Sequence, residues 1–514
     1  MNPTDLKFNI IPIVVGAIGL IVALVLGVFI GGSELSKLGI IVGLVLFVAL
    51  LGGMRQHIWL LVPIFWGFTG SVSILPLPFS VRDLVVMLCT ALGFALLALR
   101  VFKFRNSWGL LDLILLLNLG QVFIVFLSNP VGLRALSSET VGARPYFNIA
   151  IATLAYLILS NQVISRKLTR SLPIFLVIPE VFLSVVGFAT RMKPSLGFSL
   201  GMLYSDFLPA ITRASANVER VSGTVALGRG LIIALCSYFR PLSLLNPFRP
   251  GRVLLFIIGI ILVLVSGFRS QLIGVAAIFL IASYLRKGFT DTLVALAAMF
   301  MGAIFLALIN SFYPLPLGVQ RTLSSLPGQW DAVAAEDAAG STQWRLQMWK
   351  DIPQSSRYIR NRLMGDGFGF SRAELKAMER QQYRTGDMSQ EDFMLIGAFH
   401  NGPLSAIRFV GVVGMLLYYT LLIYTGVYGW RLIRASEGSA FYPLAMFVSL
   451  AFIWEPVNYT FIFGAYDSGL PNAIFGVGML KMVHNSLRFG AQKTKAEVRS
   501  GSVSLVKKEE PVLL

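Results

Sequence analysis

The chain has 514 residues, of which 56% are hydrophobic and 13% are charged, and its mean hydropathy is +0.74. A water-soluble domain cannot bury so large a share of apolar residues, and these residues come in runs long enough to cross a bilayer. The net charge of +18 does not indicate nucleic-acid binding, because many basic residues lie in short connections between apolar runs, where they set membrane topology.

Fourteen apolar runs are candidate membrane spans, so we predict an all-α polytopic membrane protein with about 12–14 transmembrane helices. Their approximate limits are 9–30, 38–53, 58–74, 84–101, 109–127, 146–163, 172–190, 226–239, 253–266, 268–285, 292–313, 402–426, 441–456 and 471–484. The first run is too long for a signal-peptide core, and we interpret it as a retained span. Cys89 and Cys236 both lie inside apolar runs, so no disulfide framework or zinc site is predicted.

The connections between the runs predict the orientation. With the N-terminus inside, the inner connections hold thirteen Lys and Arg residues and the short outer connections hold five. The inner set is Arg55, Lys103, Arg105, Arg166, Lys167, Arg170, Arg240, Arg249, Arg252, Arg286, Lys287, Arg431 and Arg434, and the outer set is Lys37, Arg82, Arg134, Arg144 and Arg269. Because basic residues favour cytoplasmic connections, both termini are predicted to be cytoplasmic.

This topology divides the chain into four parts. They are an N-terminal transmembrane bundle (1–312), a large external helical loop (313–401), C-terminal transmembrane helices (402–484) and a disordered basic cytoplasmic tail (485–514). The large loop, hereafter the polar segment, is predicted to contain amphipathic helices over 343–359 and 371–384. The glycine-rich stretch 366–370 between them follows no predicted strand, so we interpret it as a turn that presents two phenylalanines to a lipid or glycan rather than as a nucleotide loop.

Four basic side chains are predicted to meet at the outer membrane boundary: Arg229, Arg269, Arg345 and His400. Guanidinium groups make planar, bidentate contacts to phosphate oxygens, so several of them together suit a lipid-linked diphosphate. A histidine beside them can take the proton of an attacking hydroxyl. The alternative for each residue is structural: an arginine that reaches lipid headgroups or pairs with a carboxylate, and a histidine that only packs.

Three further charged residues lie within predicted spans. Glu180 follows Pro179 near mid-span, where a carboxylate is expensive and often serves transport or pairs with a buried partner. Arg408 and Glu455 lie toward the outer ends of their spans. One interpretation is that both face the same cavity as the four basic side chains, and the simpler one is a mutual ion pair. The acidic residues of the polar segment lack the spacing of a site for a metal-bound nucleotide sugar, so no metal is predicted.

Three short motifs resemble the bacterial O-antigen ligase and O-antigen polymerase superfamily. They are Ser-Gly-Phe-Arg269-Ser, Trp344-Arg345-Leu-Gln-Met-Trp349, and His400-Asn401 ahead of a span that contains Gly411 and Gly414. The resemblance covers roughly residues 222–428, and Arg408 departs from it because many members have acidic or neutral residues in that stretch.

The resemblance implies a metal-independent and cofactor-free membrane glycosyltransferase with a GT-C-like fold, located in the bacterial cytoplasmic membrane. It would join or polymerise an undecaprenyl-diphosphate-linked glycan at the outer face, with a lipid or glycan hydroxyl as acceptor, in O-antigen and lipopolysaccharide biosynthesis of the cell envelope. Arg269, Arg345 and, less closely, Arg229 would bind the donor diphosphate, and His400 would act on the acceptor hydroxyl. Asn401 and Trp349 would support them.

Two other classes of function are open at this point. A transporter or flippase of lipid-linked glycans would show ionisable groups at mid-membrane depth and broken helices in matched halves, and only Glu180 fits that description. A structural scaffold would leave the arginine and histidine positions unexplained. The sequence does not separate a ligase from a polymerase.

Overall fold

The computed structural model describes residues 57–71, 79–98, 108–132, 140–201, 204–205, 223–372, 374–376, 379 and 390–499. The chain divides into two compact units, one made of Met1–Leu92 with Val185–Ala210 and the other of Gly93–Ser184 with Ile211–Leu514. The predicted spans 9–30 and 38–53 lie outside the described residues.

In the first unit, the predicted span 58–74 is not one continuous helix. A 3₁₀ turn, η1 (Ile58–Leu60), leads into the short helix α3 (Leu61–Ile64), after which the backbone bends through two glycines. The amide of Gly70 then donates to the hydroxyl of Tyr204 at 2.9 Å. Glycine and proline interrupt helices, which explains why an apolar run of this length does not stay helical.

Arg82 was expected in an outer connection but lies in the first turn of α4 (Val81–Ala98). Its side chain is 8% exposed and forms an ion pair with Asp83 at 3.3 Å. The guanidinium also stacks over the ring of Trp66, 5.1 Å from its centroid. Arg82 therefore serves local packing and is weak evidence for topology.

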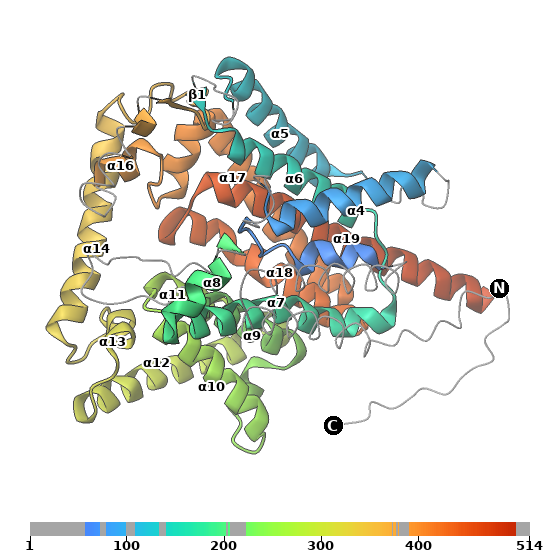
Figure 1. Ribbon diagram of the computed structural model, residues 1–514. Coiled ribbons are helices and arrows are strands. Elements are labelled where there is room, and N and C mark those ends of the chain that lie inside the picture. Colours follow the sequence, from blue (N-terminus) through green and yellow to red (C-terminus); the bar gives the residue numbers. More distant parts are fainter. Residues whose placement is uncertain are drawn as a thin grey trace. The chain divides into compact units, whose positions relative to one another are not determined.

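The second unit is a bundle of long helices. They are α5 (Leu110–Ser128), α6 (Ala143–Leu159), α9 (Gly223–Tyr238), α10 (Pro250–Val265), α11 (Arg269–Lys287), α12 (Phe289–Phe312), α17 (Gly402–Ser436), α18 (Tyr442–Val457) and α19 (Tyr466–Arg499). Helices α5 and α19 pack on α17, and α6 packs on α19 (Figure 1). Helices α9 and α11 pack on each other and on α18, which in turn packs along α17. The strand content of the described residues is one antiparallel pair, β1 (Thr140–Val141) with β2 (Phe370–Ser371).

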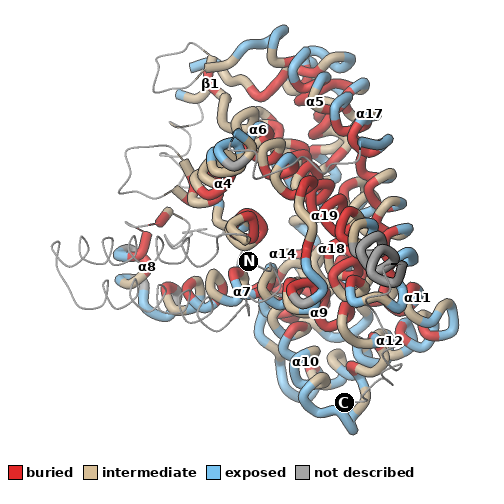
Figure 2. Tube along the Cα trace, turned by 90° about the vertical axis from the view of Figure 1, so that its right-hand side faces the viewer, coloured by how far each residue is buried: buried red, intermediate tan, exposed pale blue. Residues whose placement is uncertain are grey.

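Six helices of the described residues are long and apolar enough to cross a membrane: 110–128, 168–190, 269–287, 289–312, 402–436 and 442–462. Helices α6, α9 and α10 are shorter apolar helices. Figure 2 shows buried residues along α17 and α19 and exposed residues along α10 and α12. On α12 the side chains of Phe300, Met301 and Phe305 are 66%, 63% and 62% exposed, as suits a helix that faces lipid. The predicted class, an all-α polytopic membrane protein, is confirmed.

A buried ion pair joins three helices in this bundle. Lys481 of α19 donates to both carboxylate oxygens of Asp112 on α5, and the hydroxyl of Tyr156 on α6 donates to the same carboxylate. The side chains of Lys481 and Asp112 are 3% and 1% exposed. The ammonium and the carboxylate need each other, because burying either charge alone in a medium of low dielectric constant would cost several kcal/mol.

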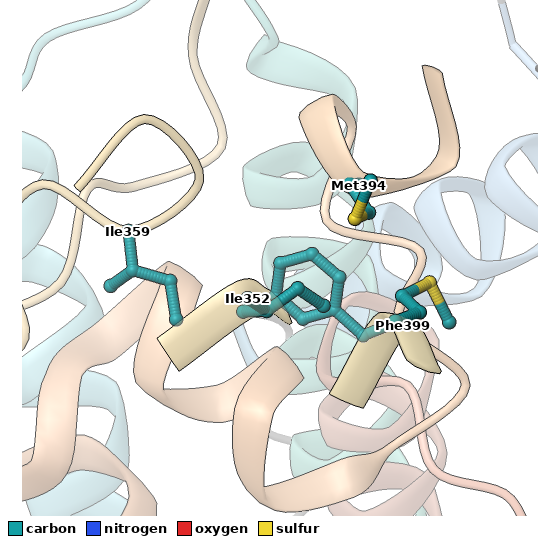
Figure 3. Close-up of a cluster of buried hydrophobic side chains, with 5 residues drawn as sticks. Ile352, Ile359, Met394 and Phe399 are labelled. Atoms are coloured by element: carbon teal, nitrogen blue, oxygen red, sulfur yellow. The ribbon is translucent and has the colours of Figure 1, made fainter. Parts of the chain in front are cut away.

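The polar segment contains α13 (Leu317–Leu323), α14 (Ala332–Asp351), the 3₁₀ turn η5 (Ile352–Gln354) and α16 (Gln390–Leu395). Helix α14 begins eleven residues before the predicted start at 343, because Asp331 caps it by accepting from the amide of Val333 at 2.8 Å. It ends ahead of Pro353, which cannot continue a helix. Met348, Ile352, Ile359, Met394 and Phe399 form the hydrophobic core of the segment (Figure 3).

Helix α17 is broken at Gly411, where φ is +72°. The chain around residues 362–367 fills the break with backbone hydrogen bonds: the Asp366 amide donates to the Arg408 carbonyl at 2.8 Å, and the Val412 amide donates to the Arg362 carbonyl at 2.8 Å. Gly365 faces Gly411 so closely that an added Cβ would lie 2.5 Å from the Gly411 nitrogen. Two glycines are therefore needed for the polar segment to pass against the helix.

The end of the chain differs from prediction. Residues 485–499 were assigned to a disordered tail but continue α19 as helix up to Arg499. Within it, residues 491–497 consist of Ala, Lys, Gln and Glu apart from one Thr, and these strong helix formers extend a helix that packing has already started. The remainder of the predicted tail lies outside the described residues.

Candidate functional site

His400 is the last residue but one before α17, and its backbone is unusual. Its φ of +52° is the one positive value among the described non-glycine residues. This left-handed conformation is sparsely populated by side-chain-bearing residues and is found preferentially at functional sites. The imidazole is half-buried among three aromatic rings, with centroid distances of 5.9 Å to Trp344, 5.9 Å to Phe393 and 5.0 Å to Phe463.

Both neighbours of His400 are fixed by hydrogen bonds. On the preceding side, the indole N–H of Trp349 donates to the carbonyl of Phe399 at 2.8 Å. On the following side, the side-chain oxygen of Asn401 accepts from the amide of Leu404 at 3.0 Å and caps α17. The two residues predicted to support the site are thus the two that hold the backbone on either side of the histidine.

Arg269 is the first residue of α11, and its guanidinium reaches α14. Its Nη2 donates to the carbonyl of Ala338 at 2.6 Å and to the hydroxyl of Thr342 at 2.9 Å. Arg345 follows Thr342 by three residues on the same helix, so it lies on the same face of α14 about one turn further along. The structure therefore gathers Arg269 and Arg345 along one face of α14, while the neighbouring Trp344 contacts His400.

Arg229 lies on α9, which packs against both α11 and α18. Its guanidinium interacts electrostatically with the carboxylate of Glu455 near the end of α18. Three residues further on, the Asn458 amide nitrogen lies 3.3 Å from the same carboxylate, at the start of a π-helical turn, η6 (Asn458–Ile462). Single π-helical turns occur frequently at functional sites.

The interpretation of Arg408 and Glu455 as a mutual ion pair is wrong. Arg408 instead pairs with Asp366, with 2.6 Å between Nη1 and Oδ2 and side-chain exposures of 10% and 9%. Asp366 also accepts from the amides of Arg360 and Asn361 at 2.8 and 2.7 Å. Arg408 thus holds the glycine-rich turn onto α17.

The glycine-rich turn does not present two phenylalanines outward. Phe368 is 2% exposed and packs against Phe409 at 4.6 Å and Tyr146 at 4.9 Å between ring centroids. Phe370 is half-buried in strand β2. The apolar side chains of this turn therefore lock the polar segment to the helices.

Beside this turn, Glu374 is held as a carboxylate. Burial alone would raise its pKa, but hydrogen bonds from the amide and hydroxyl of Ser371 and the charge of Arg360 lower the pKa overall. Among the residues that the structure describes, no group of three or more His, Cys, Asp or Glu side chains is placed to hold a metal ion.

Several buried ion pairs of the described region were not predicted from the sequence, among them two that join separate helices. Arg321 of α13 pairs with Asp337 of α14, and Lys481 pairs with Asp112. The available signal for Lys481 was its place inside an apolar run, where a lysine needs a partner. Arg321 carried no comparable signal, because a basic residue in a polar segment is ordinarily solvated.

These elements define a helical membrane protein with basic side chains at the ends of neighbouring helices and a histidine held at a junction between polar segment and membrane helix. Residues 254–419 match the family model described as O-Antigen ligase, which covers 166 of the 514 residues. The match confirms the resemblance to the O-antigen ligase superfamily and supports a glycan-transfer function in the membrane. It includes Arg269, Arg345 and His400 but not Arg229. A search of curated proteins finds no match for this chain.

Proposed function

We propose that this protein is a glycosyltransferase that joins or polymerises an undecaprenyl-diphosphate-linked glycan at the outer face of the bacterial cytoplasmic membrane. The observation that carries the proposal is the role of α14 as a common support. Arg269 bonds to this helix, Arg345 belongs to it, and Trp344 of the same helix contacts His400. Two guanidinium groups can stabilise a leaving diphosphate, and a proton acceptor can assist the attacking hydroxyl, so this set suits transfer of a diphosphate-linked sugar.

In the proposed reaction, the acceptor hydroxyl oxygen attacks the anomeric carbon of the donor sugar. The bond between that carbon and the diphosphate oxygen breaks, and undecaprenyl diphosphate leaves with the electron pair. His400 takes the hydroxyl proton on its imidazole. Arg269 and Arg345 stabilise the negative charge that grows on the leaving diphosphate, which fixed donors do without reorganisation. Arg229 is proposed to complete this set, and no metal ion is required.

The assignment to the outer face is supported by the two ends of α11. Arg269 begins the helix and Arg286 lies seventeen residues later, which corresponds to roughly 26 Å of helix, close to the thickness of a hydrocarbon core. Arg286 donates to the carbonyl of Cys236 at 3.1 Å, beside further basic residues at that end of the bundle. The positive-inside rule favours a cytoplasmic location for that end, which supports placing Arg269 at the outer boundary.

The transporter alternative rests on Glu180, which lies in α7 (Arg166–Met192) after two helix-internal prolines, Pro173 and Pro179. A flippase would move the lipid-linked glycan without forming a glycosidic bond. Product analysis separates the two functions: a glycosyltransferase releases undecaprenyl diphosphate, and a flippase does not.

The test is transfer by the purified full chain in lipid nanodiscs, supplied with an undecaprenyl-diphosphate-linked glycan and a glycan acceptor. We expect His400→Ala to lower the transfer rate by about 10²- to 10⁴-fold, which is the usual contribution of a positioned proton acceptor. Arg269→Ala is expected to abolish transfer. His484→Ala and Arg434→Ala are matched controls, because both residues lie on helices of the same bundle outside the proposed site.

The purified variants must also be compared for folding, by their elution volume and thermal unfolding midpoint. Transfer at the wild-type rate by folded His400→Ala and Arg269→Ala would refute the site. Loss of transfer in the control variants to the same extent would show that the assay reports only general damage.

A further inference from the structure

Arg321 is a buried arginine outside the proposed set of substrate-binding residues. It lies on α13, and its side chain is 3% exposed. Its Nε forms an ion pair with Asp337, and its Nη1 donates to the carbonyl of Gly267. One guanidinium therefore connects α14 to the turn between α10 and α11.

The turn that Arg321 holds is the one that leads into Arg269. Gly267 has φ of +76°, and the amide of Phe268 donates to the hydroxyl of Ser266 at 3.2 Å. The hydroxyl of Thr322, next to Arg321, lies 3.1 Å from the carbonyl oxygen of Leu264 in the last turn of α10 and 3.0 Å from the carbonyl oxygen of Gly318 in its own helix. Helix α13 thus contacts the turn through Arg321 and the end of α10 through Thr322.

The other end of the ion pair lies beside the anchor of Arg269. Asp337 directly precedes Ala338, the residue whose carbonyl accepts from Arg269 at 2.6 Å. These contacts close a ring. Arg269 bonds to Ala338 of α14, the adjacent Asp337 pairs with Arg321, and Arg321 bonds to Gly267, which lies two residues before Arg269. Figure 1 shows α13 beside the start of α14, where this ring closes.

The charge of Arg321 is already neutralised by Asp337, so it is not placed to bind a further anion. Buried ion pairs contribute little net stability, because the loss of hydration offsets the attraction between the charges. Their directional hydrogen bonds do fix geometry, since a guanidinium can hold two acceptors in one plane. A pair of this kind fits a positioning role better than a stabilising one.

We propose that Arg321 and Asp337 are positioning residues that fix the guanidinium of Arg269 beside Arg345 for the diphosphate of the donor lipid. The inference rests on the proposed function, since it gives a role to a pair that serves Arg269. Removing the pair leaves the Arg269 side chain intact but frees the turn and α14 to shift relative to each other.

The test measures binding of undecaprenyl diphosphate to the full chain in nanodiscs, which needs no turnover. In the double variant Arg321→Met/Asp337→Leu both charges are replaced by apolar side chains, so no charge is stranded. We expect its Kd to rise by about 10- to 100-fold, as for other small displacements of a binding group. Arg321→Lys keeps the charge but cannot hold both acceptors in one plane, so its Kd should lie in between.

The matched control is Lys481→Met/Asp112→Asn, which removes a similarly buried pair far along the chain and should leave the Kd unchanged. A wild-type Kd for the Arg321→Met/Asp337→Leu variant, with weakened binding by Arg269→Lys, would overturn the positioning role and leave the proposed function standing. If the double variant does not fold, a wild-type Kd for Arg321→Lys overturns it instead. Wild-type binding by Arg269→Lys would show that the proposed donor site itself is wrong.

Discussion

The contact between Gly365 and Gly411 makes a sharp prediction about how the polar segment is attached to α17. We expect Gly365→Ala to separate the two backbones. The added Cβ would lie 2.5 Å from the Gly411 nitrogen and 2.6 Å from the Phe409 carbonyl oxygen, whereas ordinary contacts of a Cβ begin at 3.4 Å. Because the opposing atoms belong to backbone, no side-chain rotation relieves the overlap.

The cost follows from the bonds that separation would break. Gly365 has φ of +87°, so alanine there costs about 1 kcal/mol from the left-handed backbone alone. The amides of Asp366 and Gly367 donate to the carbonyls of Arg408 and Phe409 at 2.8 and 3.1 Å. Losing two buried hydrogen bonds adds about 1–2 kcal/mol each. Gly365→Ala should therefore destabilise the protein by about 3–5 kcal/mol.

Gly438 supplies the matched control, because its φ of +73° is similar but an added Cβ would meet no atom within 4 Å. Gly438→Ala should show the backbone term alone, about 1 kcal/mol. The assay is unfolding of the purified full chain by SDS titration, followed by tryptophan fluorescence. Equal unfolding free energies for the two variants would refute the steric argument and the close attachment of the polar segment to α17.

Three further substitutions test the other contacts. Trp349→Phe removes the donor to the buried Phe399 carbonyl, and we expect a loss of about 1–3 kcal/mol in unfolding free energy with slower glycan transfer. Asn401→Ala should lower the unfolding free energy by about 1 kcal/mol because the helix cap is lost, whereas Asn401→Asp should retain most of the capping stabilisation. An equal drop in the thermal unfolding midpoint for both variants would contradict a capping role. Lys481→Met leaves the buried carboxylate of Asp112 without its cation and should lower the unfolding free energy by about 3–5 kcal/mol. Adding Asp112→Asn should restore most of this stability, and SDS titration measures both changes.

The places where helices begin and end near the site were readable from the sequence. Apolar runs stop where charges begin, so Arg269 was expected beside a helix start, and His400 was expected at the start of the next span. Both expectations match the observed limits of α11 and α17. It was harder to predict from the sequence that Arg269 bonds to the face of α14 that carries Arg345. That face depends on where α14 begins, and its start is set by the cap at Asp331 in an alanine-rich stretch with weak periodicity.

Pairings between distant residues could not be predicted from one sequence. Lys481 and Asp112 are 369 residues apart, and nothing local to either residue names the other. Arg408 was given the wrong partner because its depth in the membrane resembled that of Glu455. Similar depth in the membrane does not show that two residues are neighbours. The pairing of Arg408 with Asp366 depends on the break in α17, which lets the polar segment approach the helix.

The break in α17 also bears on the order in which the protein is made. The chain around residues 362–367 is synthesised before α17, yet its amides and carbonyls find their partners on that helix. Until the span at 402–436 has been inserted, these backbone groups lack their hydrogen-bond partners on α17. Folding of this part of the polar segment is therefore coupled to membrane insertion of α17. A fragment that ends at residue 401 would lack the hydrogen bonds that hold residues 362–367 in place.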